Sequence, residues 1–533
     1  MDLAGTTEPT NVAQAQPTVE PPCRYRVGVA SAAGHLFEVS LRIGAGGSTP
    51  RRLSLPAWIP GSYLIRDFAR HIVAIGAETH GESVSLTKLD KQTWELAPTA
   101  GPVEVRYQVY AFDLSVRSAY LDATRAYFNG SSLLLRLHGA EGDPCELELV
   151  RPPADQGCGQ GWTVETTLPA VAVDGAGFGR YAARDYWALI DHPVQCALHR
   201  AVEFEVQGVP HRAALSGRVE HCDLDRLAAD LRAVCAYQAR LFGALPLERY
   251  LFLLTAVGDG YGGLEHRDSC SLLCARDDLP AAGERDASEG YRKFLGLCSH
   301  EYFHLWNVKR IQPAVFSTAD LAREVHTTLL WAFEGITSYY DDLALVRSGR
   351  IPVQGYLELL ARSISRLFRT PGRRRQSLAE SSFDAWTKFY KADENAPNAI
   401  VSYYLKGSLV AWGLGVLSVA LLALGGLPPL AGFMSKWQIF VGGFQTKDGL
   451  IMALVVFAGL NSVLSLGYYA PIVNRLYRIK PAAIVENGQP VPLLMSVPLV
   501  LLCLGIVILG FWPSLVNWIT VPAAQTLLLL FGG

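Results

Sequence analysis

The stretch that decides the fold is SHEYFHLWN, residues 299–307, in which His300 and His304 stand four residues apart with Glu301 beside the first. On a helix, positions four apart lie on one face, one turn apart, so the two imidazoles can share a metal ion. Glu301 is then placed to take the proton of a water held at that metal. The stretch therefore predicts a helix that carries a metallopeptidase site.

A catalytic zinc site takes three protein ligands and keeps a further position open. Two acids downstream can supply the third ligand. Glu324 follows His304 by twenty residues, whereas Glu334 follows it by thirty and lies in the apolar stretch WAFEGITSYY, 331–340. Spacing alone leaves both acids open.

Charge divides the chain into a soluble body and a membrane tail. The net charge of −2 and pI near 6.6 give no polyelectrolyte signal, so nucleic acid is not an expected partner. No charged residue occurs from Gly407 to Ser435. After Val410 the charged residues are Lys436, Lys447, Asp448, Arg475, Arg478, Lys480 and Glu486.

Cysteine usage and the first residues indicate a reducing compartment. The ten cysteines show no paired spacing, which favours buried, unpaired thiols. Residues 1–23 contain neither a basic n-region nor an apolar core, so they are not a signal peptide. Their Thr, Pro, Ala and Gln content predicts a disordered leader.

The periodicity changes along the soluble body. Runs such as VEVRYQVYAF alternate with period two between residues 24 and 210 and predict an all-β sandwich. A helical pattern follows Cys222, opened by Asp223 or Asp225 as a cap. The apolar run 250–257 then predicts a strand that leads into a glycine-rich edge with one acid, Glu265. We expect an α+β catalytic domain over 211–412 and transmembrane helices over 413–533.

Four motifs in order resemble one known family. WIPGSYLIRDFARH, GGLEHRDS, HEYFHLWNVKRIQP and WAFEGITSYYDD are similar to the glycyl aminopeptidase family, and the resemblance covers residues 24–412. It implies an N-terminal β domain, a thermolysin-like catalytic domain and a C-terminal PDZ domain. The sequence after residue 412 does not continue into the PDZ pattern.

The resemblance implies a complete zinc centre. WAFEG looks like the W-x-x-E-G helix of related aminopeptidases and favours Glu334 over Glu324. His300, His304 and Glu334 are then the zinc ligands, and Glu301 is the general base.

It also implies the residues that hold a peptide substrate. Glu265 of GGLEH matches the acid that binds the free α-amino group, with Gly262 and Gly263 beside it. Tyr404, in Tyr404-Leu405-Lys406-Gly407, matches the tyrosine that steadies the oxyanion. The implied activity is removal of N-terminal glycine or alanine from peptides.

The tail predicts several membrane spans. An apolar run of about the length of a span over 408–440 is broken by GGLPP, and further spans are expected at 450–473 and 491–512. A weakly apolar end follows from Leu515 and is expected to be a fourth element or an interfacial segment. These helices imply membrane lipid as a partner.

A second family resemblance covers this tail. LGGLPPLAGFMSKWQIF and SLGYYAPIVNRLY look like the C-terminal end of the antiporter-like subunit N of NADH-quinone oxidoreductase. The resemblance implies a proton-path role for Lys436, and other membrane subunits of that enzyme as partners.

The basic residues Arg475, Arg478 and Lys480 follow the second span, which predicts a cytoplasmic loop. Counting back one hairpin, the peptidase body is expected on the cytoplasmic side of the membrane. Because each resemblance covers only part of its family, we expect a junction of two unrelated reading frames near 413–417. The rival functions are proton translocation by the tail, or an inactive fusion.

Overall fold

The computed structural model describes residues 22–476, with gaps at 285, 318–319 and 428–429, and short pieces between 501 and 516. These residues fall into two compact units. The first unit consists of Met1–Arg310 and Ala319–Glu324, and the second of Ile311–Thr318 and Val325–Gly533. The predicted leader, 1–23, lies outside the described residues except for its end, where β1 already begins at Cys23.

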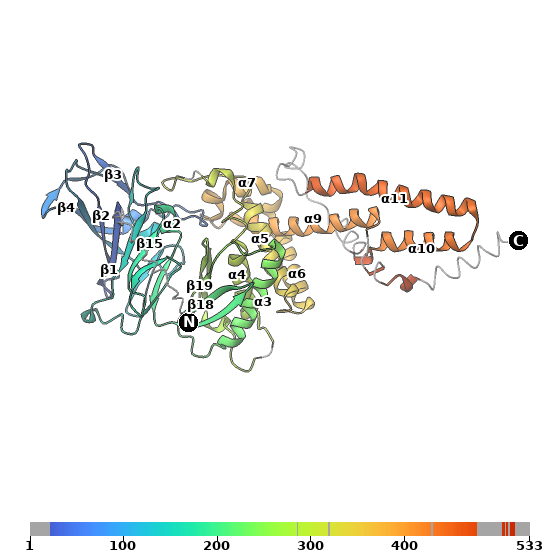
Figure 1. The fold of residues 1–533 in the computed structure, drawn as a ribbon, viewed down its shortest axis with the longest axis horizontal. Coiled ribbons are helices and arrows are strands. Elements are labelled where there is room, and N and C mark those ends of the chain that lie inside the picture. Colours follow the sequence, from blue (N-terminus) through green and yellow to red (C-terminus); the bar gives the residue numbers. More distant parts are fainter. Residues whose placement is uncertain are drawn as a thin grey trace, which may run out of the picture. The chain divides into compact units, whose positions relative to one another are not determined.

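The first unit opens with an eight-stranded sheet in the order β14-β15-β12-β1-β2-β8-β4-β5 (Figure 1). The strands β2, β8 and β12 of this sheet alternate between buried and more exposed side chains, as the period-two pattern predicts, whereas β14 at its edge is exposed throughout. The bounds are Cys23–Ser31 (β1), Leu36–Ile43 (β2), Ile72–Thr79 (β4), Glu82–Val84 (β5), Val103–Tyr110 (β8), Cys145–Leu149 (β12), Ala170–Val173 (β14) and Gly179–Ala183 (β15).

Two four-stranded sheets complete the β-rich domain. Phe37 of β2 packs edge-on against Phe128 of β10 (Arg125–Phe128), with ring centroids 5.8 Å apart, so the large sheet shares a core with a second layer. One sheet runs β11-β3-β7-β6: Arg136–Leu137, Arg51–Ser54, Thr93–Leu96 and Leu86–Lys88. The other runs β13-β16-β10-β9: Thr163–Glu165, Val194–Ala197, Arg125–Phe128 and Ala119–Leu121. Short helical segments join these strands: η1 (Phe68–His71), α1 (Gly130–Leu133), η2 (Ala154–Gln156) and α2 (Tyr186–Ile190).

A mixed five-stranded sheet in the order β17-β18-β19-β21-β20 follows the β-rich domain in the first unit. Its strands are Arg200–Val206 (β17), Val209–Gly217 (β18), Tyr250–Val257 (β19), Tyr261–Glu265 (β20) and Ser269–Ala275 (β21). The helices that accompany it are α3 (Leu224–Phe242), η3 (Arg276–Asp278) and α4 (Glu289–Phe303). The predicted strand at 250–257 is confirmed, and Asp223 caps α3 by accepting from Arg226 N. The sheet begins at Arg200 rather than at the predicted boundary of 211, because β17 pairs with β18.

The second unit is helical. Within it, η5 and η7 are single π-helical turns, and α11 contains Pro471. The elements are η4 (Ala314–Phe316), η5 (Trp331–Gly335), α5 (Ile336–Arg347), α6 (Val353–Arg369), η6 (Pro371–Arg374), α7 (Leu378–Phe383), η7 (Ala385–Phe389), α8 (Ala396–Ala399), α9 (Tyr403–Gly425), α10 (Ala431–Gln445), α11 (Gly449–Leu476) and η8 (Pro513–Val516).

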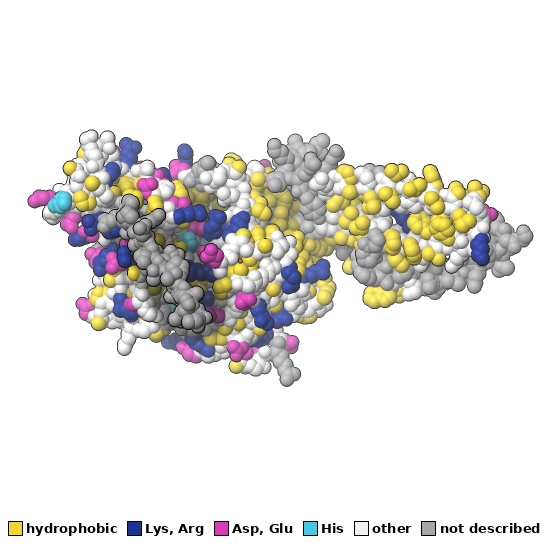
Figure 2. Space-filling view, in the orientation of Figure 1, with side chains coloured by type: hydrophobic (Ala, Val, Ile, Leu, Met, Phe, Trp, Pro, Cys, Tyr) yellow, Lys and Arg dark blue, Asp and Glu magenta, His cyan; other side chains and the backbone are white. Residues whose placement is uncertain are grey.

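Among the residues that the structure describes, two helical stretches of the second unit are long and apolar enough to cross a membrane, Ala396–Gly425 and Gly449–Asn474. Hydrophobic side chains lie exposed over α10 and α11 (Figure 2), among them Ile439, Phe457 and Leu464. As predicted, the first apolar run breaks after α9, where Gly426 ends the helix with φ +80°. The predicted span at 491–512, the element from Leu515 and the basic loop side chains lie largely outside the described residues.

The nine cysteines that the structure describes are all buried and unpaired, as expected for a reduced protein. Burial raises the pKa of the thiols, to about 12 for Cys196 and for Cys274. These thiols therefore stay protonated near neutral pH and behave as small apolar side chains.

Candidate metal and substrate site

Helix α4 carries the His-Glu-x-x-His motif at its C-terminal end. The Ser288 hydroxyl accepts from Tyr291 N at 3.1 Å and so starts the helix. The last helical residue is Phe303, and the N–H of His304, the C-cap residue, donates to His300 O at 3.3 Å. The predicted helix is confirmed, and its end coincides with the second histidine.

Two other residues of the motif, Ser299 and Tyr302, hold α4 in place. The Tyr302 hydroxyl lies 3.0 Å from His211 Nε2 of β18, and His211 Nδ1 lies 2.9 Å from the Val209 carbonyl. Since a carbonyl only accepts, Nδ1 carries the proton and Nε2 accepts from Tyr302. Burial lowers the pKa of His211 to about 4, so this imidazole stays neutral near pH 7. From α3, Gln238 Nε2 donates to Ser299 O at 2.9 Å.

The two motif histidines face each other edge to face, with ring centroids 4.7 Å apart. His304 is only 1% exposed, and its Nδ1 lies 2.8 Å from the Asn307 carbonyl. This carbonyl requires a proton on Nδ1, which leaves the lone pair of the neutral imidazole on Nε2. A backbone carbonyl that orients a histidine in this way is typical of metal-ligating histidines.

Glu301 lies against the backbone of Gly263 in the edge strand β20. A Cβ placed on Gly263 would come within 2.0 Å of Glu301 Oε1, so only glycine leaves room for this carboxylate. Glu301 is 5% exposed. The ligand atoms of Glu265, Glu301 and His304 all lie within 4.8 Å of one another. Two acids and an imidazole thus form one buried group in the first unit.

The carboxylate of Glu265 lies beneath a turn of the β-rich domain. Glu265 ends β20 and is 3% exposed. A Cβ on Gly61, which has φ +92°, would lie 2.6 Å from both carboxylate oxygens. Among the residues that the structure describes, Glu265 Oε1 has no hydrogen-bond partner. An acid buried with an unsatisfied oxygen is suited to bind a cationic ligand group.

Arg117 is a contact of the site that the sequence did not indicate. Its Nη2 donates to the carbonyl of Gly263 at 2.8 Å, and its Nη1 would lie 3.3 Å from a Cβ on Gly262. Because β20 is the last strand of its sheet, Gly262 and Gly263 lie on an edge where an extended peptide can add.

Glu334 belongs to the second unit, where it is 2% exposed within the π-helical turn η5. Such turns occur often at functional sites. The next residue, Gly335, abuts α9: a Cβ on it would lie 2.6 Å from the Cα of Gly407. Glu324, the alternative third ligand, is half-buried in the first unit. The choice of Glu334 over Glu324 stays a prediction.

Tyr404 lies in the first turn of α9, which Ser402 opens by accepting from Leu405 N at 3.2 Å. Its hydroxyl is 3.2 Å from that of Tyr390, and its ring stacks on Tyr403 with centroids 4.6 Å apart. Either of these two hydroxyls can be the donor in the hydrogen bond between them.

Lys436 lies in α10 and contacts the end of α9. Its Nζ lies 3.4 Å from the carbonyls of Leu424 and Gly425. An ammonium at these positions satisfies carbonyls that a helix end leaves unpaired and complements the helix dipole. In this contact, Lys436 caps the C-terminal end of α9.

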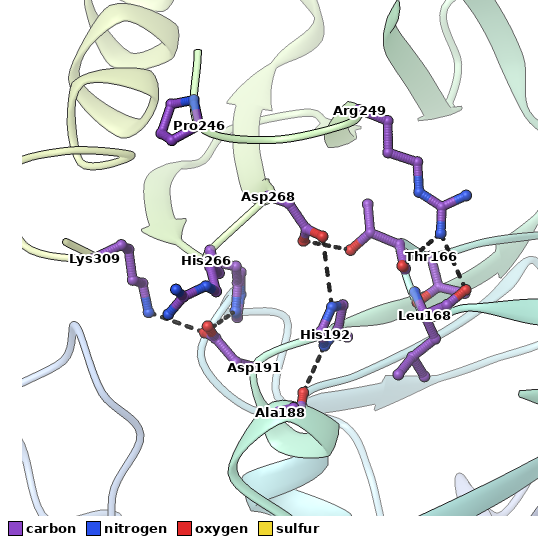
Figure 3. Close-up of polar contacts among 12 residues, drawn as sticks. Thr166, Leu168, Ala188, Asp191, His192, Pro246, Arg249, His266, Asp268 and Lys309 are labelled. Carbon is purple, nitrogen blue, oxygen red and sulfur yellow. Dashed lines mark hydrogen bonds and ion pairs between the residues drawn. The ribbon is translucent and has the colours of Figure 1, made fainter. Parts of the chain in front are cut away.

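A partly buried ionic cluster next to the site was not predicted from the sequence (Figure 3). Asp191 Oδ1 accepts from Lys309 Nζ at 2.9 Å and lies 3.3 Å from His266 Nδ1. His192 Nε2 lies 3.6 Å from Asp268 Oδ2. Lys309 follows His304 by five residues in the sequence. This short separation was the one feature of the sequence that could have indicated that Lys309 lies near the site.

Comparison with known proteins decides the family. The model for the Peptidase M61 N-terminal domain matches residues 24–197, and that for M61 glycyl aminopeptidase matches 293–410. The crystal structure of the aminopeptidase N family protein from Idiomarina loihiensis is 39% identical and has a TM-score of 0.72. That comparison covers 87% of this chain and 77% of the other. The chain belongs to the M61 glycyl aminopeptidase family.

This M61 protein is a metallopeptidase, and the predicted fold class is confirmed. From residue 413 to 462 the M61 chain matches a second model, the transmembrane part of NADH:quinone oxidoreductase/Mrp antiporters. The predicted fusion of two families is therefore confirmed, and the two matched ranges meet between residues 410 and 413.

Curated relatives match the tail of the M61 protein. F(420)H(2) dehydrogenase subunit N from Methanosarcina mazei is 35% identical over 111 residues, which are 21% of this chain and 22% of that protein. NADH-quinone oxidoreductase subunit N from Geobacter metallireducens is 40% identical over 99 residues, 19% of this chain and 20% of that protein. The chain thus spans about a fifth of the length of these relatives.

Proposed function

We propose that residues 24–412 act as a zinc aminopeptidase that removes N-terminal glycine or alanine from peptides. The observation that carries this proposal is the grouping of Glu265, Glu301 and His304 within 4.8 Å. In a peptide, the α-nitrogen lies about 2.5 Å from the carbonyl carbon of its own residue, and each further residue adds about 3.8 Å. An ammonium bound to Glu265 therefore leaves only the first peptide bond near Glu301.

The covering of Glu265 supports a small first residue. The Gly61 backbone lies so close to the carboxylate that even a methyl group on Gly61 would collide with it. The Gly61 backbone therefore bounds one side of the space next to the carboxylate, and we infer that this favours glycine or alanine over bulky side chains.

The proposed zinc ligands are His300, His304 and Glu334. The donor set suits zinc, because two imidazoles and one carboxylate are a known catalytic ligand set. The hydrogen bond from His304 Nδ1 to Asn307 O also fits, since it presents Nε2 as the ligand atom. Zinc bound there would polarise the scissile carbonyl and lower the pKa of a water toward ~7.

The remaining roles belong to side chains of the chain. Glu301 takes the proton of the attacking water and delivers it to the leaving amine. Tyr404 donates its hydroxyl proton in a hydrogen bond to the developing oxyanion, a contact whose loss costs about 3–4 kcal/mol in other systems. The edge strand at Gly262 and Gly263 pairs with the substrate backbone, and Glu265 holds the α-ammonium.

The test uses the full chain purified in detergent. Glycine and alanine arylamides should be cleaved, whereas the same compounds with an acetylated α-amine should not, because Glu265 then has no cation to bind. Metal analysis should find zinc in stoichiometric amount, and chelation should abolish cleavage. A chain that binds zinc but cleaves acetylated and free substrates equally would contradict an aminopeptidase. A chain that does neither is the inactive fusion.

We propose that the tail anchors the peptidase in a membrane with the catalytic part on the cytoplasmic side. The apolar stretches of α9 and α11 support the anchor. Protease treatment of sealed inverted vesicles should digest the peptidase part, whereas right-side-out vesicles should protect it. The opposite pattern would reverse the orientation.

The match to antiporter-like subunits supports a second candidate, proton translocation with other membrane subunits of a quinone oxidoreductase. Its marker residue is Lys436, whose contact with the end of α9 instead supports a capping role. Proton uptake by proteoliposomes that contain the full chain, abolished in Lys436→Met, would favour translocation.

A further inference from the structure

The ionic cluster beside Glu265 contains the ammonium group of Lys309, which is chemically similar to the α-ammonium of the proposed substrate. Lys309 donates to Asp191 at 2.9 Å, and Asp191 in turn contacts His266, the residue that follows Glu265. Figure 3 shows Lys309 and His266 meeting on the Asp191 carboxylate, which comes from the end of α2 in the β-rich domain. The internal ammonium thus lies close to the carboxylate proposed to bind the substrate's ammonium.

Electrostatics link Lys309 to both acids. Burial lowers the pKa of Lys309, but the negative charges of Asp191 and Glu265 raise it by more than burial lowers it. The pKa of Lys309 is therefore above its ordinary value. Burial also raises the pKa of Asp191, yet Lys309 and His266 outweigh it and hold this pKa well below its usual range. Lys309 and Asp191 are therefore both charged near neutral pH and neutralise each other.

Glu265 has no comparable partner among the described residues. Its Oε1 is buried without a hydrogen bond, although a cation lies within electrostatic reach. Burying an unpaired carboxylate costs free energy. Lys309 would therefore pair with Glu265 if no other anion bound Lys309.

We propose that Asp191 is a positioning residue that holds the Lys309 ammonium away from Glu265 and so keeps Glu265 open for the substrate's α-ammonium. The proposal rests on the proposed role of Glu265. A tethered lysine competes at an effective concentration of millimolar or more. If it occupied Glu265, the apparent affinity for substrate would fall by the fraction of chains left competent.

The test compares Asp191→Asn, Lys309→Met and the double variant as full chains in detergent. Asp191→Asn frees the ammonium and should raise KM for glycine arylamide at least about tenfold, with kcat changed by less than about threefold. The double variant removes the competitor together with its partner and should return KM to within about threefold of wild type. Asp191→Glu keeps the anion and should also restore it. Asp174→Asn, in the exposed pair with Arg151, is the matched control and should leave both constants unchanged.

A high KM in the double variant would overturn the proposal, because the Asp191 effect would then be structural. An unchanged KM in Asp191→Asn would also overturn it. If Asp191→Asn does not fold, the double variant decides: a folded double variant with normal KM supports the proposal, and one with high KM overturns it.

A binding measurement separates this proposal from the proposed function. Calorimetry with 2-aminoethanol, which has the ammonium of glycine but no carbonyl to cleave, reports ammonium binding without hydrolysis, and it should show the same loss in Asp191→Asn and the same recovery in the double variant. Failure of the wild type to hydrolyse any arylamide would defeat the proposed function while this binding series stands. 2-Aminoethanol binding that is equal in all variants would defeat the positioning role alone.

Discussion

Helices α4 and α9 start alike but meet different surroundings. Each begins at a serine whose hydroxyl accepts from the N–H three residues on, Ser288 from Tyr291 and Ser402 from Leu405. Nine of the fifteen residues of α4 are buried, against five of the 23 in α9. The start signal therefore does not choose the environment. The arrangement of apolar residues does: α4 buries one side, whereas α9 is apolar all round.

The largest expected effect breaks the chemistry of α4 without touching its packing. Glu301→Gln keeps the shape of the side chain but cannot take a proton, so arylamide hydrolysis should fall by about 10²–10⁴-fold. Zinc content and thermal stability should be unchanged. Glu289→Gln, exposed in the first turn of the same helix, is the matched control. Full activity in Glu301→Gln would exclude it as the general base.

Two glycine-to-alanine substitutions compare how tightly the second unit is packed in its peptidase part and in its tail. Gly335→Ala puts a methyl group about where the Gly407 backbone lies, so unfolding should become easier by about 1–3 kcal/mol. Gly442→Ala in α10 meets no atom within 4 Å and should be stabilising by up to about 1 kcal/mol through helix propensity. Denaturant unfolding in detergent measures both. Effects of equal sign would show that α9 does not pack as described.

A pH titration of stability sharpens the comparison on the side of the first unit. The pKa of Asp191 is held below its ordinary value by Lys309 and His266, against the opposing effect of burial. The ionised Asp191 carboxylate makes its full contribution to the free energy of unfolding above the pKa of about 4 that an aspartate has in the unfolded chain. This contribution is lost as the pH falls below that value, by at most about 1.4 kcal/mol per pH unit. Between pH 5 and pH 3, the free energy of unfolding should therefore fall more for the wild type than for Asp191→Asn. The difference between the two slopes should be at most about 1.4 kcal/mol per pH unit. Parallel curves would contradict this account.

The smallest effect concerns the tail. Lys436→Met removes the ammonium from the carbonyl end of α9 and should lower stability by about 0.3–1 kcal/mol. Arylamide hydrolysis should not change, since Lys436 serves the helix end. A loss of hydrolysis would show that the tail and the catalytic chemistry depend on each other.

Local patterns were sufficient for much of the fold. The strand at 250–257, the cap at Asp223 and the helix with His300 and His304 follow from periodicity and spacing, and each is present. The sheet to which β17 belongs could not be read in this way. Its alternation is the same whichever sheet it joins, and only pairing with β18 settles it.

The surroundings of the site depend on contacts between distant residues. Arg117 and Gly263 are 146 residues apart, and Asp191 and Lys309 are 118 apart. A single acid or arginine in a loop has no periodicity or spacing, so one sequence gives no reason to join such pairs. The motifs located the chemistry, whereas the groups that cover and neutralise it required the structure.

The junction of the two families lies inside one continuous helix, since the matched ranges end at 410 and resume at 413 while α9 runs from Tyr403 to Gly425. Contacts with the peptidase helices continue past it: a Cβ on Gly415 would lie 3.7 Å from the Tyr339 hydroxyl of α5. A helix has rotational phase, and each inserted residue turns everything after it by about 100°. Adding one residue at the junction would swing Gly415 away from α5, whereas adding seven would almost restore its direction. A fusion within a helix thus keeps both partners' faces only at certain lengths.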